Sequence, residues 1–235
     1  LADEYINKLE RFGHWKDTAI MLEGEAVNSF VVLFLQMWSV TEKELVVEPY
    51  LVEHEKSRRA NGYVIPYGDS PLDIDKIGEN VYIDILNHAR DYVYIMTPYL
   101  ILDSEMEHAI CFAAERGVDV RIIMPGIPDK PIPYALAKTY FSKLMRSGVK
   151  IYLYKPGFVH AKVFISDDSK AVVGTINLDY RSLYHHFECA TYMYKVDAIQ
   201  DIYKDCLQTL KDCKRVTPEM VNNRPAYEKI IGLLV

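Results

Sequence analysis

Helical and strand patterns alternate along the chain from residue 79 onward, and this alternation limits the fold more than any other feature of the sequence. Apolar residues at helical spacing predict helices at residues 79–91, 104–117, 133–148 and 196–213. Runs rich in Val, Ile and Tyr predict strands at residues 92–100, 118–126, 149–157, 158–167, 170–177 and 188–195. Strands that alternate with helices of this length predict an α/β fold, with a mixed and mostly buried β-sheet flanked by helices on both faces.

The N-terminal part carries a weaker signal. Residues 26–38 form the longest apolar stretch, AVNSFVVLFLQMW, which is well short of the ~20 residues that span a bilayer and therefore predicts a buried core helix. A strand at 17–23 followed by a helix at 25–43 would repeat the order of the strand at 188–195 and the helix after it. This internal repeat aligns Leu1 with Leu178 and predicts that a counterpart of the segment before Leu178 precedes Leu1.

Charge and cysteine usage exclude several classes of function. The formal net charge is −6 and the sequence pI is about 5.7, so no general basic field attracts phosphate backbones, and nucleic acid is not expected as a partner. Any affinity for phosphate must come from a local site. The cysteines form no C-x-x-C pair, which predicts free thiols and neither a zinc site nor another cofactor; they are Cys111, Cys189, Cys206 and Cys213.

One motif carries recognisable chemistry. Residues 160–177 read HAKVFISDDSKAVVGTIN and fit the spacing H-x-K-x(4)-D-x(6)-G-[ST]-x-N at every position. On a strand, His160 and Lys162 share one face, so an imidazole and an ammonium lie side by side. The lysine offers charge and donors to a phosphoryl oxygen, and the imidazole can attack phosphorus or move a proton. The pair therefore predicts a phosphodiester site that needs no metal.

Further residues of the motif are expected to support this site. Gly174, Thr175 and Asn177 follow on the next strand, where small residues allow close approach and offer donors to the same phosphate. Asp167 ends the first strand at a tight turn, so we expect it to orient a neighbour or cap the turn rather than to react.

Residues outside the motif leave alternatives open. Glu188 either accepts a hydrogen bond from an imidazole or is a charged strand end. Tyr99 stands at a strand end, where it contacts a ligand or only packs. His185 and His186 lack a third ligand at metal spacing, which favours loop histidines over a metal site.

The motif resembles the signature of the phospholipase D superfamily. The phrases TPYLILD, AAERGVDVRIIMPGIPDK, GVKIYLYKPGFVHAK, GTINLDYRS and HHFECA are similar to bacterial cardiolipin synthases of the two-motif type, and the resemblance covers nearly the whole chain. It implies a phospholipase D-like fold and a phosphatidyltransferase of phospholipid biosynthesis.

In that family, two motifs of one chain meet in one active site. The resemblance implies that one histidine attacks phosphorus to give a phosphatidyl-histidine, while the other protonates the leaving glycerol and then activates the incoming alcohol. Two phosphatidylglycerols thereby give cardiolipin and glycerol. His160 would be the second-motif histidine, acting as general acid and base, with Lys162, Thr175 and Asn177 stabilising phosphoryl charge.

The resemblance also implies how the chain is organised. Residues 1–60 would be the remainder of a first phospholipase D-like half, and residues 61–235 the second half with its complete motif. The implied partners are phosphatidylglycerol, the missing N-terminal half and a membrane surface. The parent protein would lie in the bacterial cell membrane with its catalytic part facing the cytoplasm, whereas residues 1–235 are expected to be soluble by themselves.

Two other readings compete with this one. A self-sufficient single-motif phosphodiesterase or nuclease could complete its site as a homodimer. A non-catalytic lipid-binding domain could keep the fold with an idle site, but an intact set of motif residues is unexpected in such a domain.

Overall fold

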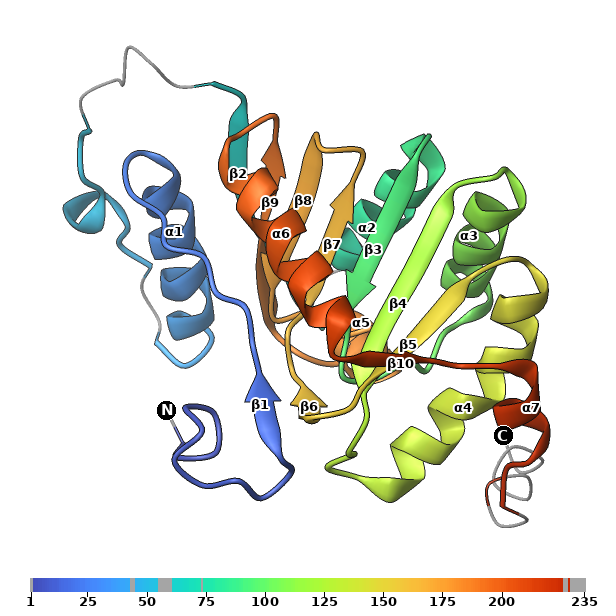
Figure 1. The fold of residues 1–235 in the computed structure, drawn as a ribbon. Coiled ribbons are helices and arrows are strands. Elements are labelled where there is room, and N and C mark those ends of the chain that lie inside the picture. Colours follow the sequence, from blue (N-terminus) through green and yellow to red (C-terminus); the bar gives the residue numbers. More distant parts are fainter. Residues whose placement is uncertain (1, 43–44, 55–60, 73, 226–227, 229–235) are drawn as a thin grey trace.

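An eight-stranded mixed sheet forms the centre of the molecule, with the strand order β10-β5-β4-β3-β7-β8-β9-β2 (Figure 1). The computed structural model describes residues 2–42, 45–54, 61–72, 74–225 and 228. The strands are β1 (His14–Lys16), β2 (Tyr63–Asp69), β3 (Tyr92–Met96), β4 (Asp119–Pro125), β5 (Lys150–Tyr154), β6 (Gly157–Val159), β7 (Val163–Ser166), β8 (Lys170–Gly174), β9 (Glu188–Tyr194) and β10 (Cys213–Arg215). Strands β3, β4 and β5 are parallel neighbours, and the other pairs of this sheet are antiparallel.

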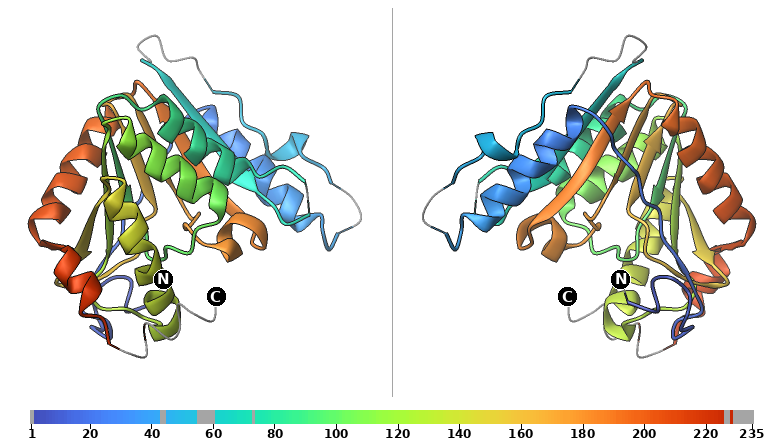
Figure 2. Two further views of the ribbon diagram at one scale, coloured as in Figure 1. Left: turned by 90° about the vertical axis from the view of Figure 1, so that its right-hand side faces the viewer. Right: turned by 90° about the vertical axis from the view of Figure 1, so that its left-hand side faces the viewer.

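Helices cover both faces of the sheet, as the sequence predicts (Figure 2). They are α1 (Ala26–Trp38), the 3-10 helix η1 (Glu48–Tyr50), α2 (Ile77–His88), α3 (Ser104–Glu115), α4 (Pro131–Arg146), α5 (Tyr180–Tyr184), α6 (Ala198–Lys211) and α7 (Pro218–Asn222). Side chains of α2, α3 and α4 share one buried cluster with the sheet, and side chains of α6 share a second cluster on the opposite face. The predicted α/β fold is therefore confirmed.

The strand predicted over residues 158–167 is divided in two. Strand β6 pairs in parallel with β1 in a separate two-stranded sheet, whereas β7 joins the main sheet between β3 and β8. Residues 160–162 cross from one sheet to the other without regular strand structure. The expected alternation survives this break, because Phe164 packs in one cluster while Ala161 and Val163 pack in the other.

Two expectations for the N-terminal part are wrong. Residues 17–23 form no strand, and the strand lies just earlier, at β1, where backbone pairing with β6 is available. Helix α1 contains no buried residue, although a buried core helix is predicted there. The side chains of Phe34 and Trp38 are 55% and 58% exposed. Apolar composition predicts that a helix will be covered, but α1 packs mainly against β2, at the sheet edge. The predicted end of this helix, at residue 43, lies outside the described residues, as does Leu1.

Asp167 holds the tight turn that joins β7 to β8. Asp167 and Asp168 both have positive φ, at 51° and 54°, a conformation that Asp tolerates better than most residues. The Asp167 carboxylate accepts hydrogen bonds from three successive backbone N–H groups, those of Arg90, Asp91 and Tyr92, at 2.9–3.0 Å. These bonds fix the entry into β3 next to β7.

We expect Asp167→Asn to lower the free energy of unfolding by about 1–3 kcal/mol, because an amide presents one acceptor and a donor to three backbone donors. Asn also tolerates positive φ, so the turn itself should survive. Urea denaturation monitored by circular dichroism measures the change. The exposed Asp197, whose side chain makes no capping hydrogen bond, provides a matched Asp197→Asn control. Equal stability of the two variants would contradict the assigned role.

Candidate functional site

Strand β1 brings an acidic residue to His160. In the parallel β1–β6 pair, Lys16 is opposite Val159, and the backbone N–H of His160 donates to the Lys16 carbonyl at 2.7 Å. The residue after Lys16 therefore lies beside His160. Its carboxylate accepts a hydrogen bond from the imidazole, with 2.8 Å between Asp17 Oδ2 and His160 Nδ1. Two residues that are 143 positions apart in the sequence thus form the centre of the site.

Lys162 lies against the other ring nitrogen of His160. Its ammonium is 2.8 Å from His160 Nε2 and donates to the His160 carbonyl at 2.5 Å. Since an ammonium only donates and a carboxylate only accepts, this order assigns the Nδ1–H tautomer to the neutral imidazole, with Nε2 as the acceptor. The imidazole is therefore held from both sides.

Burial changes the acidity of both neighbours of His160. The Lys162 side chain is 7% exposed, and this burial lowers the pKa of Lys162 to about 8, although the charges of Asp17, Glu188 and Asp179 oppose the shift. Burial raises the pKa of Asp17, but the hydrogen bond and charge of His160 and the charge of Lys162 outweigh it, so the pKa lies below its usual value. Asp17 is thus an anion at neutral pH.

Aromatic rings enclose the His160 imidazole. The Tyr5 ring stacks on it, with 5.7 Å between centroids and an interplanar angle of 14°. The rings of Trp15 and Phe158 follow at 4.9 and 6.1 Å. These contacts limit rotation of the imidazole and exclude water from one side of it.

A hydroxyl and amide network surrounds Glu188. The carboxylate accepts hydrogen bonds from the Thr175 hydroxyl and, at 2.7 Å, from the Ser182 hydroxyl. The Asn177 side-chain amide in turn donates to the Ser182 hydroxyl at 2.9 Å. Thr175 and Asn177, expected to donate to a phosphate, thus organise Glu188 in this structure. Glu188 does not contact His160, because Asp17 takes that position.

Gly174 permits close approach, though of another strand rather than of a phosphate. A Cβ atom at Gly174 would lie 2.4 Å from the Ala190 Cβ on β9. Its backbone N–H donates to the Lys162 carbonyl at 3.3 Å. Gly174 therefore holds β8 against β9, which brings the Glu188 network within electrostatic reach of Lys162.

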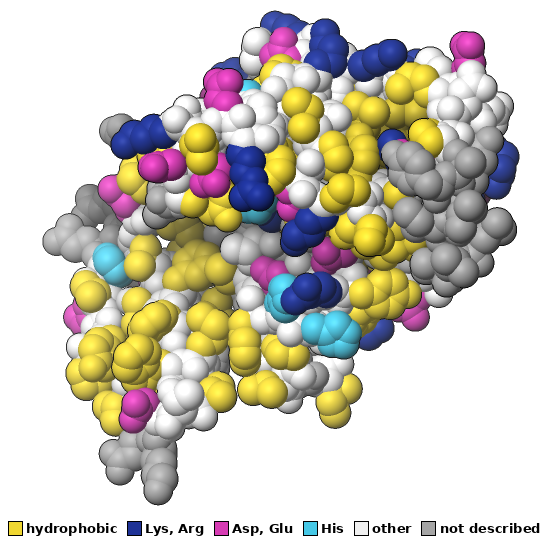
Figure 3. Space-filling model, turned by 90° about the horizontal axis from the view of Figure 1, so that it is seen from below, with side chains coloured by type: hydrophobic (Ala, Val, Ile, Leu, Met, Phe, Trp, Pro, Cys, Tyr) yellow, Lys and Arg dark blue, Asp and Glu magenta, His cyan; other side chains and the backbone are white. Residues whose placement is uncertain are grey.

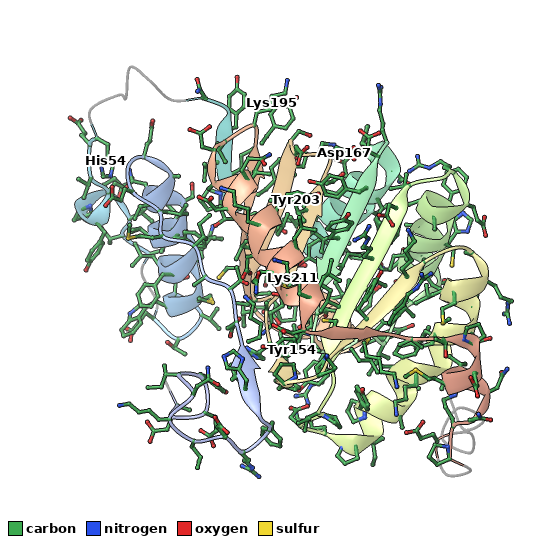
Figure 4. All side chains as sticks on the ribbon, in the orientation of Figure 1. His54, Tyr154, Asp167, Lys195, Tyr203 and Lys211 are labelled. Carbon is green, nitrogen blue, oxygen red and sulfur yellow. The ribbon has the colours of Figure 1, made fainter. Side chains whose placement is uncertain are left out.

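Other predicted residues lie apart from the imidazole. Asp167 is at the far end of β7, at the top of the sheet in Figure 4, whereas β6, which leads into His160, is at the bottom in Figure 1. Asp167 thus lies away from the imidazole, at the turn where a capping role is expected for it. His185 and His186 lie in the turn before β9, with His186 Nδ1 3.6 Å from Glu188 Oε1.

Tyr99 makes a polar contact as well as packing. Its hydroxyl donates to Asp129 Oδ2 at 2.5 Å, and the Lys130 ammonium lies 5.4 Å from its ring centroid. Burial, followed by the hydrogen bond and charge of Asp129, raises the Tyr99 pKa far above its usual value. The Tyr99 hydroxyl is therefore a donor and not a base.

Asp17 is the site residue that the sequence did not identify. The signal was present in the internal repeat, which pairs the strand beginning at Glu188 with the segment beginning at Asp17. Each acid precedes the helix of its own copy of the repeat. Asp17 precedes α1 in the N-terminal copy, which we call the first unit, and Glu188 precedes α6 in the C-terminal copy, the second unit. An acid in the position of Glu188 was thus visible in the first unit, but its contact with His160 was not.

One acidic group within the described residues has the geometry to hold a metal ion. Oxygens of Glu79, Asp103 and Glu105 lie within 4.8 Å of one another. The ammonium of Lys76 lies 3.6 Å from Glu79 and 3.9 Å from Glu105, and so already supplies a positive charge. Burial, followed by the proximity of Asp103, raises the pKa of Glu79 to about 7. This group is better described as a lysine-neutralised cluster than as a metal site.

Comparison with known proteins identifies the family of this chain. Residues 82–209 match the family described as cardiolipin synthase, phospholipase D-like domain. The chain belongs to this family. It is 69% identical over its whole length to an uncharacterized protein of Streptococcus mutans, of which it covers 51%. It is also 34% identical over 98% of its length to cardiolipin synthase 2 of Bacillus anthracis, of which it covers 45%. The chain spans about half the length of the curated relatives it matches.

Solved structures share the fold of this chain. Phosphatidylserine synthase of Haemophilus influenzae superposes with a TM-score of 0.57 at 18% identity, over 73% of this chain and 44% of that one. The phospholipase D family member Nuc of Salmonella typhimurium superposes with a TM-score of 0.56 at 16% identity, over 66% of this chain and 99% of that one. The phospholipase D-like fold predicted from the motif is thus confirmed. Among the described residues, no helix combines the length and apolarity needed to cross a membrane.

The tautomer of His160 can be tested directly. We expect long-range ¹⁵N NMR spectra of the neutral imidazole to show the Nδ1–H form, because Asp17 accepts from Nδ1 and Lys162 donates to Nε2. Asp17→Asn should give a mixture of tautomers, since the amide can donate as well as accept. Glu23→Gln, an exposed change in the same segment, should leave the spectrum as it was. A predominant Nε2–H form in the unmodified protein would contradict the assignment.

Proposed function

We propose that the chain contributes one half of the active site of a phosphatidyltransferase that converts two phosphatidylglycerols into cardiolipin and glycerol. The observation that carries the proposal is the row formed by the Asp17 carboxylate, the His160 imidazole and the buried Lys162 ammonium. In such a row Asp17 holds Nδ1 and leaves Nε2 to gain or lose the catalytic proton, beside a positive charge that suits a phosphoryl oxygen. Resemblance to cardiolipin synthases supplies the substrate.

The proposed reaction has two steps. The histidine of the other motif, in the preceding half, attacks the phosphorus of one phosphatidylglycerol, and the P–O bond to glycerol breaks as His160, protonated at this stage on both ring nitrogens, gives its Nε2 proton to the leaving oxygen. His160 then takes the proton from a glycerol hydroxyl of another phosphatidylglycerol. That oxygen attacks phosphorus, the P–N bond breaks, and the first histidine is released. Lys162 neutralises the phosphoryl charge, and Asp17 stabilises the protonated His160.

Two features support a site divided between two halves of a longer protein. Asp17 precedes α1 and reaches across to His160, so the N-terminal residues complete the site of the following unit. The exposed apolar side chains of α1 lack a covering layer within the described residues. We therefore assign residues 1–60 to a preceding phospholipase D-like half and residues 61–235 to the second half. By the same repeat, Glu188 would orient the histidine of the preceding half.

The proposed substrate also implies a location. Phosphatidylglycerol resides in the membrane, so the full-length protein would act at the bacterial cell membrane with its catalytic part facing the cytoplasm. Lipid would reach the site directly from that surface.

The decisive assay uses the full-length product of the gene that encodes these residues, residues 1–235 alone, and the full-length His160→Ala variant. With labelled phosphatidylglycerol, we expect the full-length protein to form cardiolipin and release glycerol. His160→Ala should lower the rate at least 10²-fold, as loss of a general acid and base does. Residues 1–235 alone should be inactive. Turnover by residues 1–235 alone would instead support a homodimeric single-motif phosphodiesterase.

Lys162 should set an alkaline limit to activity. Because the pKa of Lys162 is lowered to about 8, its ammonium is charged below that pH and neutral above it. We expect kcat/KM to fall as pH rises through about 8. Lys162→Arg should keep the charge and move this limit upward, at a lower kcat because the guanidinium differs in shape.

Lys211→Arg, a change on the exposed surface of α6, provides the control for this pH profile and should leave the limit in place. The assignment to Lys162 is wrong if the limit stays near pH 8 in Lys162→Arg.

A further inference from the structure

A groove of about 560 Å³ lies between α1 and the edge of the main sheet formed by β2 and β9. Helix α1 contributes Leu33 and Met37 to its wall, the turn after α1 contributes Val40, and Phe187 before β9 also lines the groove. Figure 3 shows a hollow on the left of the molecule, where α1 lies, with hydrophobic side chains gathered around it. The volume lies within the range of about 300–1,000 Å³ that is usual for small-molecule sites.

The two ends of the groove differ in chemistry. Thr175 and Glu188, which belong to the network beside Lys162, line one end. The rest is mostly apolar, with Gln36, Asp69 and Ser70 as the polar exceptions, and is open to solvent: the side chains of Met37, Val40 and Leu72 are 46%, 59% and 69% exposed. Exposed apolar side chains that surround a continuous groove mark a binding surface. The groove therefore leads from the polar site into an apolar channel.

Two details of the groove wall indicate a preformed site. A Cβ atom at Gly68 would lie 2.7 Å from Leu33 Cδ2, so glycine lets α1 approach β2 this closely. Tyr67 also lines the groove, and its hydroxyl is buried without a hydrogen-bond partner among the described residues. A buried hydroxyl without a partner is unfavourable, and an ester oxygen of a bound lipid would accept a hydrogen bond from it.

A second, larger cavity does not share these properties. It has a volume of about 960 Å³ and lies between the other face of α1, including Phe34 and Trp38, and the segment that contains Leu45 and Tyr50. No residue of the candidate site lines it. Of these two cavities, the first is the one lined by Thr175 and Glu188.

We propose that the groove of Leu33, Met37 and Tyr67 binds an acyl chain of the phospholipid whose phosphodiester lies at His160. The inference rests on the proposed function and specifies where the lipid chain lies. A phospholipid joins a charged phosphodiester to apolar chains. The groove is lined by Thr175 and Glu188, whose charge reaches Lys162, and otherwise mostly by apolar side chains. The chain would thereby hold the phosphorus in place.

Native cysteines allow binding of an acyl chain in the groove to be tested without measuring enzymatic activity. Cys189 lines the groove and is half-buried, whereas Cys213 is half-buried elsewhere on β10. We would follow maleimide labelling of both thiols by mass spectrometry in the full-length protein, with lysophosphatidylglycerols of 8 to 14 acyl carbons or with glycerol 3-phosphate. Longer chains should slow labelling of Cys189 at least tenfold and leave Cys213 unchanged. Glycerol 3-phosphate, which lacks a chain, should protect neither.

Variants that fill the groove provide the matched comparison. Met37→Trp and Val40→Phe should each abolish the protection of Cys189, whereas Ile74→Trp, at a position 98% exposed and outside the groove, should retain it. Undiminished protection in both groove variants would overturn the proposal. So would a Cys189 that resists labelling in the full-length protein without lipid, because the preceding half would then fill the groove.

Turnover of short, monomeric phosphatidylglycerols completes the test. We expect KM to fall roughly two- to fourfold for each added methylene between dihexanoyl and dioctanoyl substrates, since a fully buried methylene contributes about 0.8 kcal/mol. Met37→Trp should remove this dependence, whereas Ile74→Trp should keep it and leave kcat for the dihexanoyl substrate within about twofold. Absence of cardiolipin with Cys189 still protected would refute the proposed function and not the groove. A chain-length dependence equal in Met37→Trp and Ile74→Trp would refute the groove.

Discussion

The short pairing of β1 with β6 is the interaction on which the site depends. Only three residues of each strand pair, yet their register continues into the hydrogen bond between the His160 N–H and the Lys16 carbonyl. Beyond that bond the chain leaves the small sheet and enters the main one as β7. His160 and Lys162 thus lie where two sheets meet, with their backbone held on both sides. If β6 and β7 formed one continuous strand, β1 would have to continue beside it, and Asp17 would not turn toward the His160 side chain.

The acids of the two repeated units divide their roles between units. Asp17 comes from the first unit and contacts the imidazole of the second, while Glu188 comes from the second and contacts no catalytic imidazole. Thr175, Ser182 and the amide of Asn177 nevertheless hold Glu188 in one orientation, which is the preorganisation that an acidic partner of a histidine needs. In the proposed arrangement, the motif of each half is completed by the acid of the other half.

Much of the fold could be predicted from sequence because it is local. The helices and strands between residues 77 and 211 follow apolar periodicity, and the motif spacing located His160 and Lys162. The contact of Asp17 with His160 could not be read in this way, since it depends on strand pairing across 143 positions. The error for α1 has a related cause. An apolar helix must be covered, but its sequence does not say whether a core, another half or a ligand covers it.

The electrostatics of the site indicate where binding energy must come from. Lys162 is surrounded by the carboxylates of Asp17, Glu188 and Asp179, and burial has already lowered its pKa. A phosphate beside Lys162 therefore lies in a largely acidic environment, in a chain with a net charge of −6. Attraction between charges alone would bind such a substrate weakly. Contacts far from the phosphorus must supply the missing binding energy. They can do so without weakening the stabilisation of charge in the transition state. A lipid substrate satisfies the requirement, because its chains supply apolar area that a free phosphodiester lacks.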